Sequence, residues 1–190
     1  MTQRSTDTQV HPIFIDRWSP RAYDGSRLRD ADVEALLEAA RWAPSAYNAQ
    51  PWRLLYSVQG DANWDRFLNL LVPFNQSWAK NSSMLIIFVS ATMSHDKPFY
   101  SHSFDTGAAW MSLALQAHLM GLHAHGMAGF DHDAARTELG IPDDFHVEAA
   151  AAVGRQADAS TLPEALRERE VPSDRLPLGE IAFAGNFGGS

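Results

Sequence analysis

The sequence feature that most constrains the fold is the apolar run from Met84 to Val89. It is rich in β-branched and aromatic residues, and its length is typical of a strand rather than a buried helix. Since no position is polar, such a strand is expected to be buried on both faces of a sheet. The run therefore predicts a central strand, and 190 residues are enough to bury a real core around it.

The remaining patterns place helices and strands alternately along the chain, with no internal repeat. We expect helices over 30–42, 61–71, 105–120 and 134–139, strands over 53–58, 84–89, 123–127, 147–153 and 178–183, and a turn over 129–131. This order predicts an α+β fold in which helices flank a central mixed sheet. We expect one domain over residues 1–190, with an arm over 1–13 and a frayed tail over 185–190.

Local signals set several of these boundaries. Asp30 and Asp105 are predicted to cap the helices that they precede, and Pro73 is predicted to close the second helix. Leu55 is expected to be buried in its strand. In the alanine-rich stretch that ends at Gly154, the pattern favours a strand packed tightly beneath a helix.

The helix expected to follow Asp105 is apolar on more than one stripe. Its apolar residues are Ala108, Trp110, Met111, Leu113, Ala114, Ala117 and Met120. Such a helix must be covered almost all round. In a domain of this size, we expect a second subunit to provide part of that cover.

Composition and charge exclude several classes of function. The net charge of −8, with scattered Lys and Arg residues, argues against nucleic-acid binding. The apolar runs are far too short to span a membrane, and the polar N-terminus does not resemble a signal peptide. With no cysteine, disulfides and thiolate chemistry are excluded. We expect a cytoplasmic protein with no membrane partner.

A loop between the first helix and the first long strand has an unusual composition. The string Ala-Pro-Ser-Ala-Tyr-Asn-Ala-Gln-Pro-Trp at 43–52 brings together Ser45, Asn48 and Gln50, whose side chains offer hydrogen-bond donors and acceptors at short range. A plain helix-to-strand turn is the alternative reading. Arg17 and Arg21 also need an explanation in so acidic a chain; a phosphate site is one, and solvated surface charge is the other.

Three segments, in order, resemble the nitroreductase family of flavoenzymes. They are Arg17-Trp18-Ser19-Pro20-Arg21, Pro-Ser-Ala-Tyr-Asn-Ala-Gln-Pro-Trp at 44–52, and Ser173-Asp174-Arg175, and the resemblance extends from about residue 14 to residue 183. It implies a nitroreductase-like fold and an intertwined homodimer that binds FMN. It further implies transfer of two electrons from NAD(P)H to a small acceptor, such as a nitroaromatic or quinone, by a ping-pong mechanism.

The resemblance also assigns the cofactor-binding residues. It places Arg17, Trp18, Ser19, Arg21 and Arg175 at the phosphate and polar edge of FMN, and Asn75 near the pyrimidine side. It places Met127, Ala128 and Gly129 against the ring, with the Ala128 backbone N–H near N5, and Pro44, Ser45, Ala46 and Asn48 on the segment reaching the flavin from the partner subunit.

The chain departs from the family pattern at two positions. Ser173 stands where the family often has a second cation, so either the phosphate clamp is weaker or Arg169 reaches in. Ala128 stands where many relatives have a glutamate, which keeps a backbone donor but removes a carboxylate. No catalytic side chain is assigned.

Other chemistries are weakly supported. His118, His123 and His125, with Asp131, would be the candidates for a metal site, but we expect no metal. The chain lacks a Gly-x-Ser-x-Gly nucleophile elbow, a Gly-x-Gly-x-x-Gly motif and a P-loop. Two alternatives stay open: a flavoenzyme of the same fold that acts on an enone, activated alkene or halogenated aromatic, and a non-catalytic flavin-binding protein.

Overall fold

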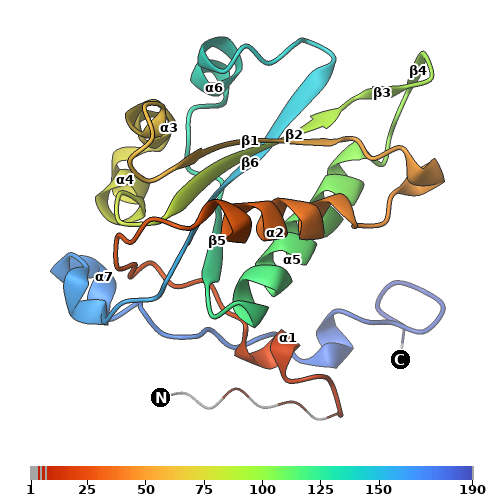
Figure 1. The fold of residues 1–190 in the computed structure, drawn as a ribbon. Helices are drawn as coiled ribbons and strands as arrows, with labels where there is room; N and C mark the ends of the chain where they lie inside the picture. The colour runs from red at the N-terminus through yellow and green to blue at the C-terminus, as the bar shows by residue number, and fades with distance from the viewer. Residues whose placement is uncertain (1–3, 5, 7, 190) are drawn as a thin grey trace.

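The computed structural model describes residue 4, residue 6 and residues 8–189, so the other residues of the arm and the end of the tail lie outside the described residues. Its helices and strands follow the chain in the order of Figure 1. These are α1 Ile13–Asp16, α2 Asp30–Arg41, η1 Ala46–Asn48, β1 Trp52–Val58, α3 Trp64–Leu70, α4 Pro73–Ala79, β2 Met84–Ala91, β3 Met93–Ser94, β4 Lys97–Pro98, α5 His102–Leu119, β5 His123–Met127, α6 His132–Glu138, β6 Phe145–Gly154, η2 Ala159–Thr161, α7 Glu164–Arg167 and η3 Leu178–Glu180.

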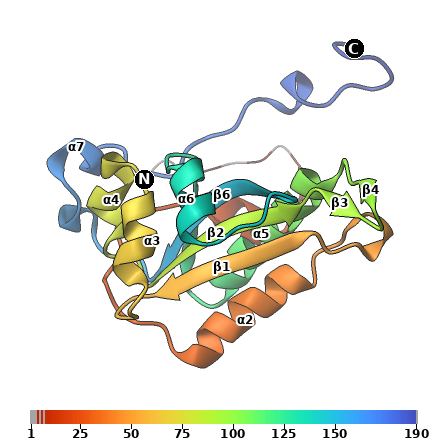
Figure 2. The same ribbon diagram turned by 90° about the horizontal axis from the view of Figure 1, so that it is seen from above.

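The core is a four-stranded sheet in the order β1-β2-β6-β5, between two layers of helices (Figures 1 and 2). On β2, Leu85, Ile87 and Val89 pack into the cluster that includes α3, α4 and α6. The intervening residues Ile86 and Phe88 pack into the cluster of α2 and α5 on the opposite face. This alternation confirms that β2 is a central strand buried on both faces.

The sheet is antiparallel throughout, so the expectation of a mixed sheet is wrong for the described residues. Helices between strands often mark parallel crossovers. Here, however, the connections from β1 to β2 and from β5 to β6 start and finish at the same end of the sheet, so each second strand runs antiparallel to the first. Leu55 is only partly buried, since its strand β1 is an edge of the sheet.

Two of the expected helix boundaries are wrong. Asp30 is the first residue of α2 and makes no capping bond; instead Arg29 pairs with Asp32 at 2.6 Å. Pro73 opens the additional helix α4 rather than closing α3, because a proline in the first turn sacrifices no helical hydrogen bond.

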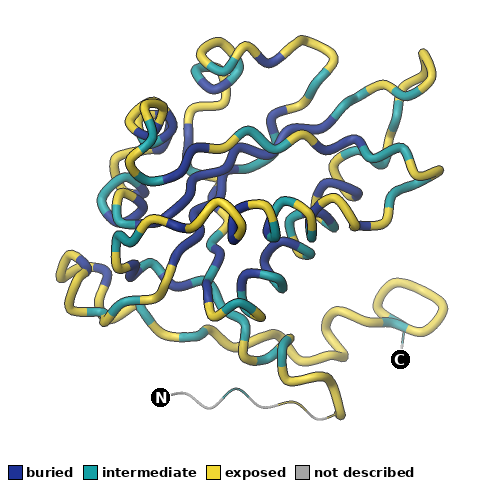
Figure 3. Tube along the Cα trace, in the orientation of Figure 1, coloured by how far each residue is buried: buried dark blue, intermediate teal, exposed yellow. Residues whose placement is uncertain are grey.

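The end of the chain does not form the strand expected over 178–183. It holds the short helix η3 instead, and no strand of the described residues pairs with it. Leu178 and Ile181 are exposed there. The segment extends away from the body of the protein in Figure 2, and Figure 3 shows it exposed along nearly its whole length.

Candidate functional site

Arginines from distant parts of the sequence meet in one pocket of about 330 Å³. We call it the arginine pocket. Its lining consists of Arg4, Arg17, Arg21, Arg169 and Arg175 together with Trp18, Ser19, His125, Val171 and Ser173. The structure thus brings the first and last of the three sequence motifs together. It also places Arg169 in the pocket, one of the two possibilities left open by Ser173.

The segment that carries Arg17 and Arg21 is held from two sides. A carboxylate oxygen of Glu170 accepts hydrogen bonds from the backbone N–H groups of Arg21 at 2.7 Å and Ala22 at 2.8 Å. On the other side, Nδ1 of His125 on β5 donates to the Pro20 carbonyl at 3.0 Å. The backbone of the pocket is therefore fixed by contacts far apart in sequence.

His125 is neutral at ordinary pH. Burial lowers its pKa to about 4, and the nearby Arg21 and Arg17 charges act in the same direction. Its ring also lies 4.7 Å from that of Trp78, centroid to centroid. We infer that His125 serves the pocket as a neutral spacer and hydrogen-bond donor rather than as a further cation.

The pocket has a surplus of positive charge near Arg17. Burial, followed by the guanidinium groups of Arg4 and Arg175, lowers the pKa of Arg17. Nε of Arg21 is buried and has no acceptor among the described residues, and the guanidinium group of Arg17 donates there only to the Ser19 hydroxyl, at 3.3 Å. Unpartnered guanidinium donors and mutual repulsion would both be relieved by an anion with several acceptor oxygens.

Arg175 reaches the pocket from the C-terminal segment. It donates to the Ser173 carbonyl and hydroxyl at 3.3 Å and to the Asp174 carbonyl at 2.9 Å. These acceptors are uncharged, so they orient the guanidinium without neutralising it. Arg175 therefore adds to the cationic character of the pocket.

A second group of the expected site residues extends from the pocket along β5. Met127 ends that strand, and Asn75 on α4 donates to the Gly129 carbonyl at 2.9 Å. A Cβ on Gly129 would lie 2.7 Å from Nδ2 of Asn75, so only glycine allows this approach. Along an extended chain, Ala128 is about 10 Å from His125. Ala128 is exposed, and its backbone N–H donates to no acceptor among the described residues.

The loop over 44–50 is strained and exposed. Tyr47, Asn48 and Gln50 all have positive φ angles, between 47° and 55°, and Tyr47 is 99% exposed. Such conformations cost non-glycine residues about 1 kcal/mol or more each, and they persist where surrounding contacts or a function enforce them. Here the Ser45 hydroxyl accepts from the Gln50 N–H at 3.0 Å.

Asp105 fixes this loop to α5. Its buried carboxylate accepts hydrogen bonds from the Ala46 N–H and the Ser101 hydroxyl, both at 3.1 Å. The expectation that Asp105 caps α5 is therefore wrong: the helix begins three residues earlier, at His102, and the carboxylate serves the loop.

The loop and the arginine pocket lie at opposite ends of α5. Asp105 is in the first turn, whereas the pocket residue Trp18 packs against His123, which packs in turn against His118 near the end of the helix. At 1.5 Å per residue, Asp105 and His118 are separated by about 20 Å along the helix. One chain therefore does not bring Ser45, Ala46 and Asn48 to its own pocket.

The histidines do not gather as metal ligands. Within the part of the chain that the structure describes, no three His, Asp or Glu side chains are grouped as a metal site requires. No helix in that part is long and apolar enough to cross a membrane.

Sequence reasoning missed three contributors to this geometry. Arg4 lies in the arm over 1–13, Glu170 lies outside every expected helix and strand, and Asp105 was assigned to a helix cap. Each makes at least one hydrogen bond with a residue 11 or more positions away, and no local pattern indicates such contacts.

The chain is similar to known proteins over most of its length. A family model described as the Nitroreductase family matches residues 15–72 and 59–155. A putative NADH dehydrogenase/NAD(P)H nitroreductase of Archaeoglobus fulgidus is 28% identical over 157 residues, which cover 80% of this chain and 88% of that protein.

Two solved structures are similar to the whole fold. A crystal structure described as an oxidoreductase containing FMN is 50% identical, with a TM-score of 0.95 and coverage of 98% of this chain and 97% of the other. A putative nitroreductase in complex with FMN, from Desulfovibrio desulfuricans, is 25% identical, with a TM-score of 0.74 and coverage of 94% and 99%.

Proposed function

Because this chain belongs to the nitroreductase family, we propose that it is an FMN-dependent oxidoreductase that transfers two electrons from NAD(P)H to a small acceptor by a ping-pong mechanism. Nitroaromatics and quinones are the acceptor classes that we propose. The observation that carries this proposal is the arginine pocket, which supplies unpartnered cationic donors, with the exposed residue Ala128 about 10 Å along the extended chain from the pocket residue His125. The two FMN-containing relatives support the choice of anion.

The described residues fit FMN at both of its ends. Arg17, Arg21 and Arg175 would bind its phosphate through charge-assisted hydrogen bonds. The unsatisfied buried Nε of Arg21 is a donor that a phosphate oxygen would satisfy. The Ala128 N–H, about 10 Å along the chain from His125, would face the ring edge. A bound flavin would supply the two-electron redox chemistry, as flavin cofactors do generally.

The protein's own residues would bind the flavin, orient its ring and shield it from solvent. Asn75 is held by Gly129 beside the Ala128 segment and would limit where a ring can lie. We propose that Pro44, Ser45, Ala46 and Asn48 contact the ring from a second copy of the chain. The exposed side chains of Tyr100 and Phe104, near the start of α5, would then cover the same site. No side chain of the pocket is assigned as a proton donor.

The α5 surface supports a homodimer. Phe104, Met111 and Leu119 lie along one exposed face, with Phe104 83% and Leu119 67% exposed. Met111 is midway between the other two in sequence. A two-fold axis near Met111 would therefore pair two α5 helices antiparallel and bury all three side chains.

That arrangement would also complete the site. Since the loop lies at the start of α5 and the arginine pocket at its end, antiparallel pairing would bring the loop of one subunit to the pocket of its partner. Each dimer would then hold two equivalent flavin sites at the interface. Contacts with the partner subunit, which one chain alone lacks, would then stabilise the strained backbone of the loop.

The absorption spectrum of the purified protein, followed by an anaerobic titration with NADH and NADPH, tests this function. We expect a flavin spectrum, extracted FMN, and bleaching by at least one nucleotide that is reversed by a quinone or nitroaromatic. Bound flavin that neither nucleotide reduces would favour a non-catalytic binding protein. Reoxidation by an enone, and not by nitroaromatics or quinones, would favour the other flavoenzyme class.

A further inference from the structure

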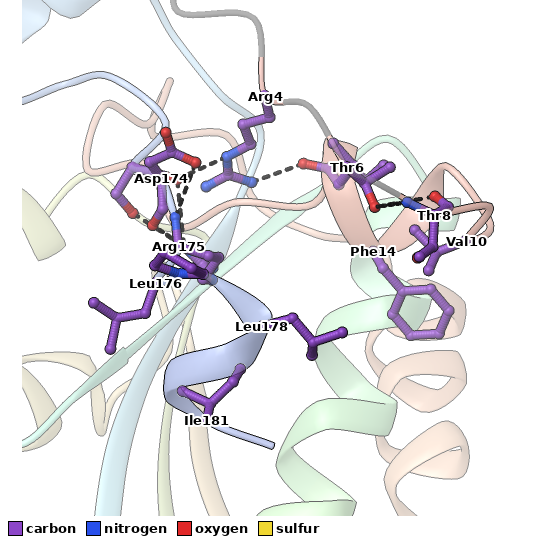
Figure 4. A pocket seen from close by; sticks show the side chains of 13 residues that line it. Arg4, Thr6, Thr8, Val10, Phe14, Asp174, Arg175, Leu176, Leu178 and Ile181 are labelled. Atoms are coloured by element: carbon purple, nitrogen blue, oxygen red, sulfur yellow. Dashed lines mark hydrogen bonds between the residues drawn. The ribbon is translucent and has the colours of Figure 1, made fainter. Parts of the chain in front are cut away.

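Arg4 is held in place by three backbone carbonyl groups. Its Nε donates to the Ser173 carbonyl at 2.9 Å, and its Nη1 donates to the carbonyls of Ile15 at 2.7 Å and Arg17 at 2.9 Å. The arm, the exit of α1 and the C-terminal segment therefore converge on one guanidinium group. Figure 4 shows Arg4 beside Asp174 and Arg175 at the edge of a neighbouring pocket.

The charge of Arg4 is not neutralised by this arrangement. Carbonyl acceptors carry no net charge, and Arg4 forms no ion pair with a carboxylate among the described residues. Burial and the charge of Arg175 lower the pKa of Arg4, whereas Asp174 opposes them more weakly. Nη2 of Arg4 also donates to no acceptor in the described part of the chain.

Arg4 lies on the wall between two cavities. It lines the arginine pocket and also the neighbouring pocket of about 500 Å³, and Arg175 and Ser173 are shared in the same way. The Arg17 carbonyl that holds Arg4 belongs to the same residue whose guanidinium enters the arginine pocket. A fixed, partly buried cation beside Arg17 and Arg175 is costly unless an anion binds there.

We propose that Arg4 is a further phosphate-binding residue at the phosphate end of the flavin site. The inference rests on the proposed FMN site. Arg4 would donate to the phosphate through the edge of the guanidinium that the carbonyls leave free. Its three carbonyl contacts preorganise the guanidinium for that role.

The test compares FMN with riboflavin, which lacks the phosphate, by flavin fluorescence titration of the apoprotein. Arg4→Met should weaken FMN binding about 10-fold, since one charge-assisted contact is lost, and should leave riboflavin affinity unchanged. Arg4→Lys keeps the charge and should lose less. Arg66→Met is the matched control, because Arg66 is exposed on α3 and lines neither pocket.

Different outcomes separate the possible failures. If Arg4→Met weakens FMN and riboflavin equally, Arg4 only stabilises the fold and the inference is overturned. If both affinities match those of Arg66→Met, Arg4 does not touch the phosphate. If the wild-type protein binds the two flavins equally well or not at all, the proposed phosphate site fails, and the role of Arg4 fails with it.

A second measurement does not depend on a variant. Trypsin cleaves after arginine, so the peptide bond that follows Arg4 reports on the access of protease to this residue. Saturating FMN should slow this cleavage at least several-fold relative to riboflavin. Equal rates with the two flavins would contradict a contact between Arg4 and the phosphate.

Discussion

The arginine pocket and the loop over 44–50, at the two ends of α5, differ in how far contacts within one chain account for their structure. The pocket is assembled within one chain: Glu170 and His125 fix its backbone, and its arginines form no ion pair with a carboxylate among the described residues. The loop is held to α5 through Asp105, is strained, and exposes Tyr47 almost completely. We propose that the first region binds an anionic ligand and that the surface of a second subunit covers the second region.

This difference indicates which part of FMN each subunit would bind in a shared site. A pocket whose charges are already placed can bind phosphate without a partner, so affinity for that group should depend on one subunit. Because the loop lies about 20 Å away along α5, we propose that it acts on the pocket of another copy. Phosphate recognition and ring recognition should therefore respond to different substitutions.

The sharpest test of this division is a mixed dimer. One subunit carries Arg17→Glu with Arg21→Glu, and the other carries Ser45→Asp with Asn48→Asp; each should be free of flavin as a homodimer. In the mixed dimer, one site holds both lesions and the other holds neither. We expect about one FMN per dimer, half the content of the wild type.

Two affinity tags isolate the mixed species, and the absorption spectrum gives its flavin content. Circular dichroism of each parent homodimer controls for folding. A mixed dimer without flavin, formed from two folded parents, would mean that each subunit builds its own site.

The next largest effect is expected at the phosphate end. Replacing Arg17 or Arg175 with alanine removes a charge-assisted hydrogen bond worth roughly 1.5–3 kcal/mol, so FMN affinity should fall about 10- to 150-fold. Riboflavin should bind the wild type much more weakly and should hardly respond to either substitution. Equal affinity for FMN and riboflavin in the wild type would refute the clamp.

These two regions also show which features of the fold and of the candidate site can be predicted from the sequence. The apolar run of β2 and the apolar surface of α5 were predictable, because periodicity and composition report burial directly. The three motifs located the arginines and the loop through family resemblance. Their roles stay predictions, since the structure shows where the residues lie and not what they bind.

What the sequence could not supply are contacts made across long separations. Asp105 and Glu170 each bind backbone N–H groups, and any carboxylate near such a group could do so. The antiparallel sheet was missed because the path of a connection depends on how helices pack, and Pro73 was misread because proline is compatible with both the end and the start of a helix.

A pH-dependent effect should arise at the pocket from His125. Its pKa is lowered from about 6.5 in the unfolded chain to about 4 in the fold, so the unfolded state gains a proton first as the pH falls. Its contribution is complete above pH 6.5 and is lost progressively toward pH 4. Between pH 7 and pH 5 we expect this residue to cost about 2 kcal/mol of stability.

Urea denaturation of the wild type and His125→Gln at both pH values isolates this effect from the other titrating groups. Glutamine can still donate to the Pro20 carbonyl but does not titrate, so the stability of the variant should fall less between pH 7 and pH 5. Parallel pH profiles for the two proteins would show that His125 is not the group responsible.

The smallest effect is expected at Asp105, and it distinguishes the two regions by its pattern. Asp105→Asn replaces a charged acceptor with a neutral one for the Ala46 N–H, at a cost of about 1 kcal/mol. Because this loop is proposed to contact the ring and not the phosphate, FMN and riboflavin should both bind about fivefold more weakly. Selective weakening of FMN binding alone would instead connect Asp105 with the phosphate end.

Ser101→Ala is the matched control for Asp105→Asn. It removes the other donor to the same carboxylate and leaves the loop contact in place, so its flavin affinities should stay close to those of the wild type.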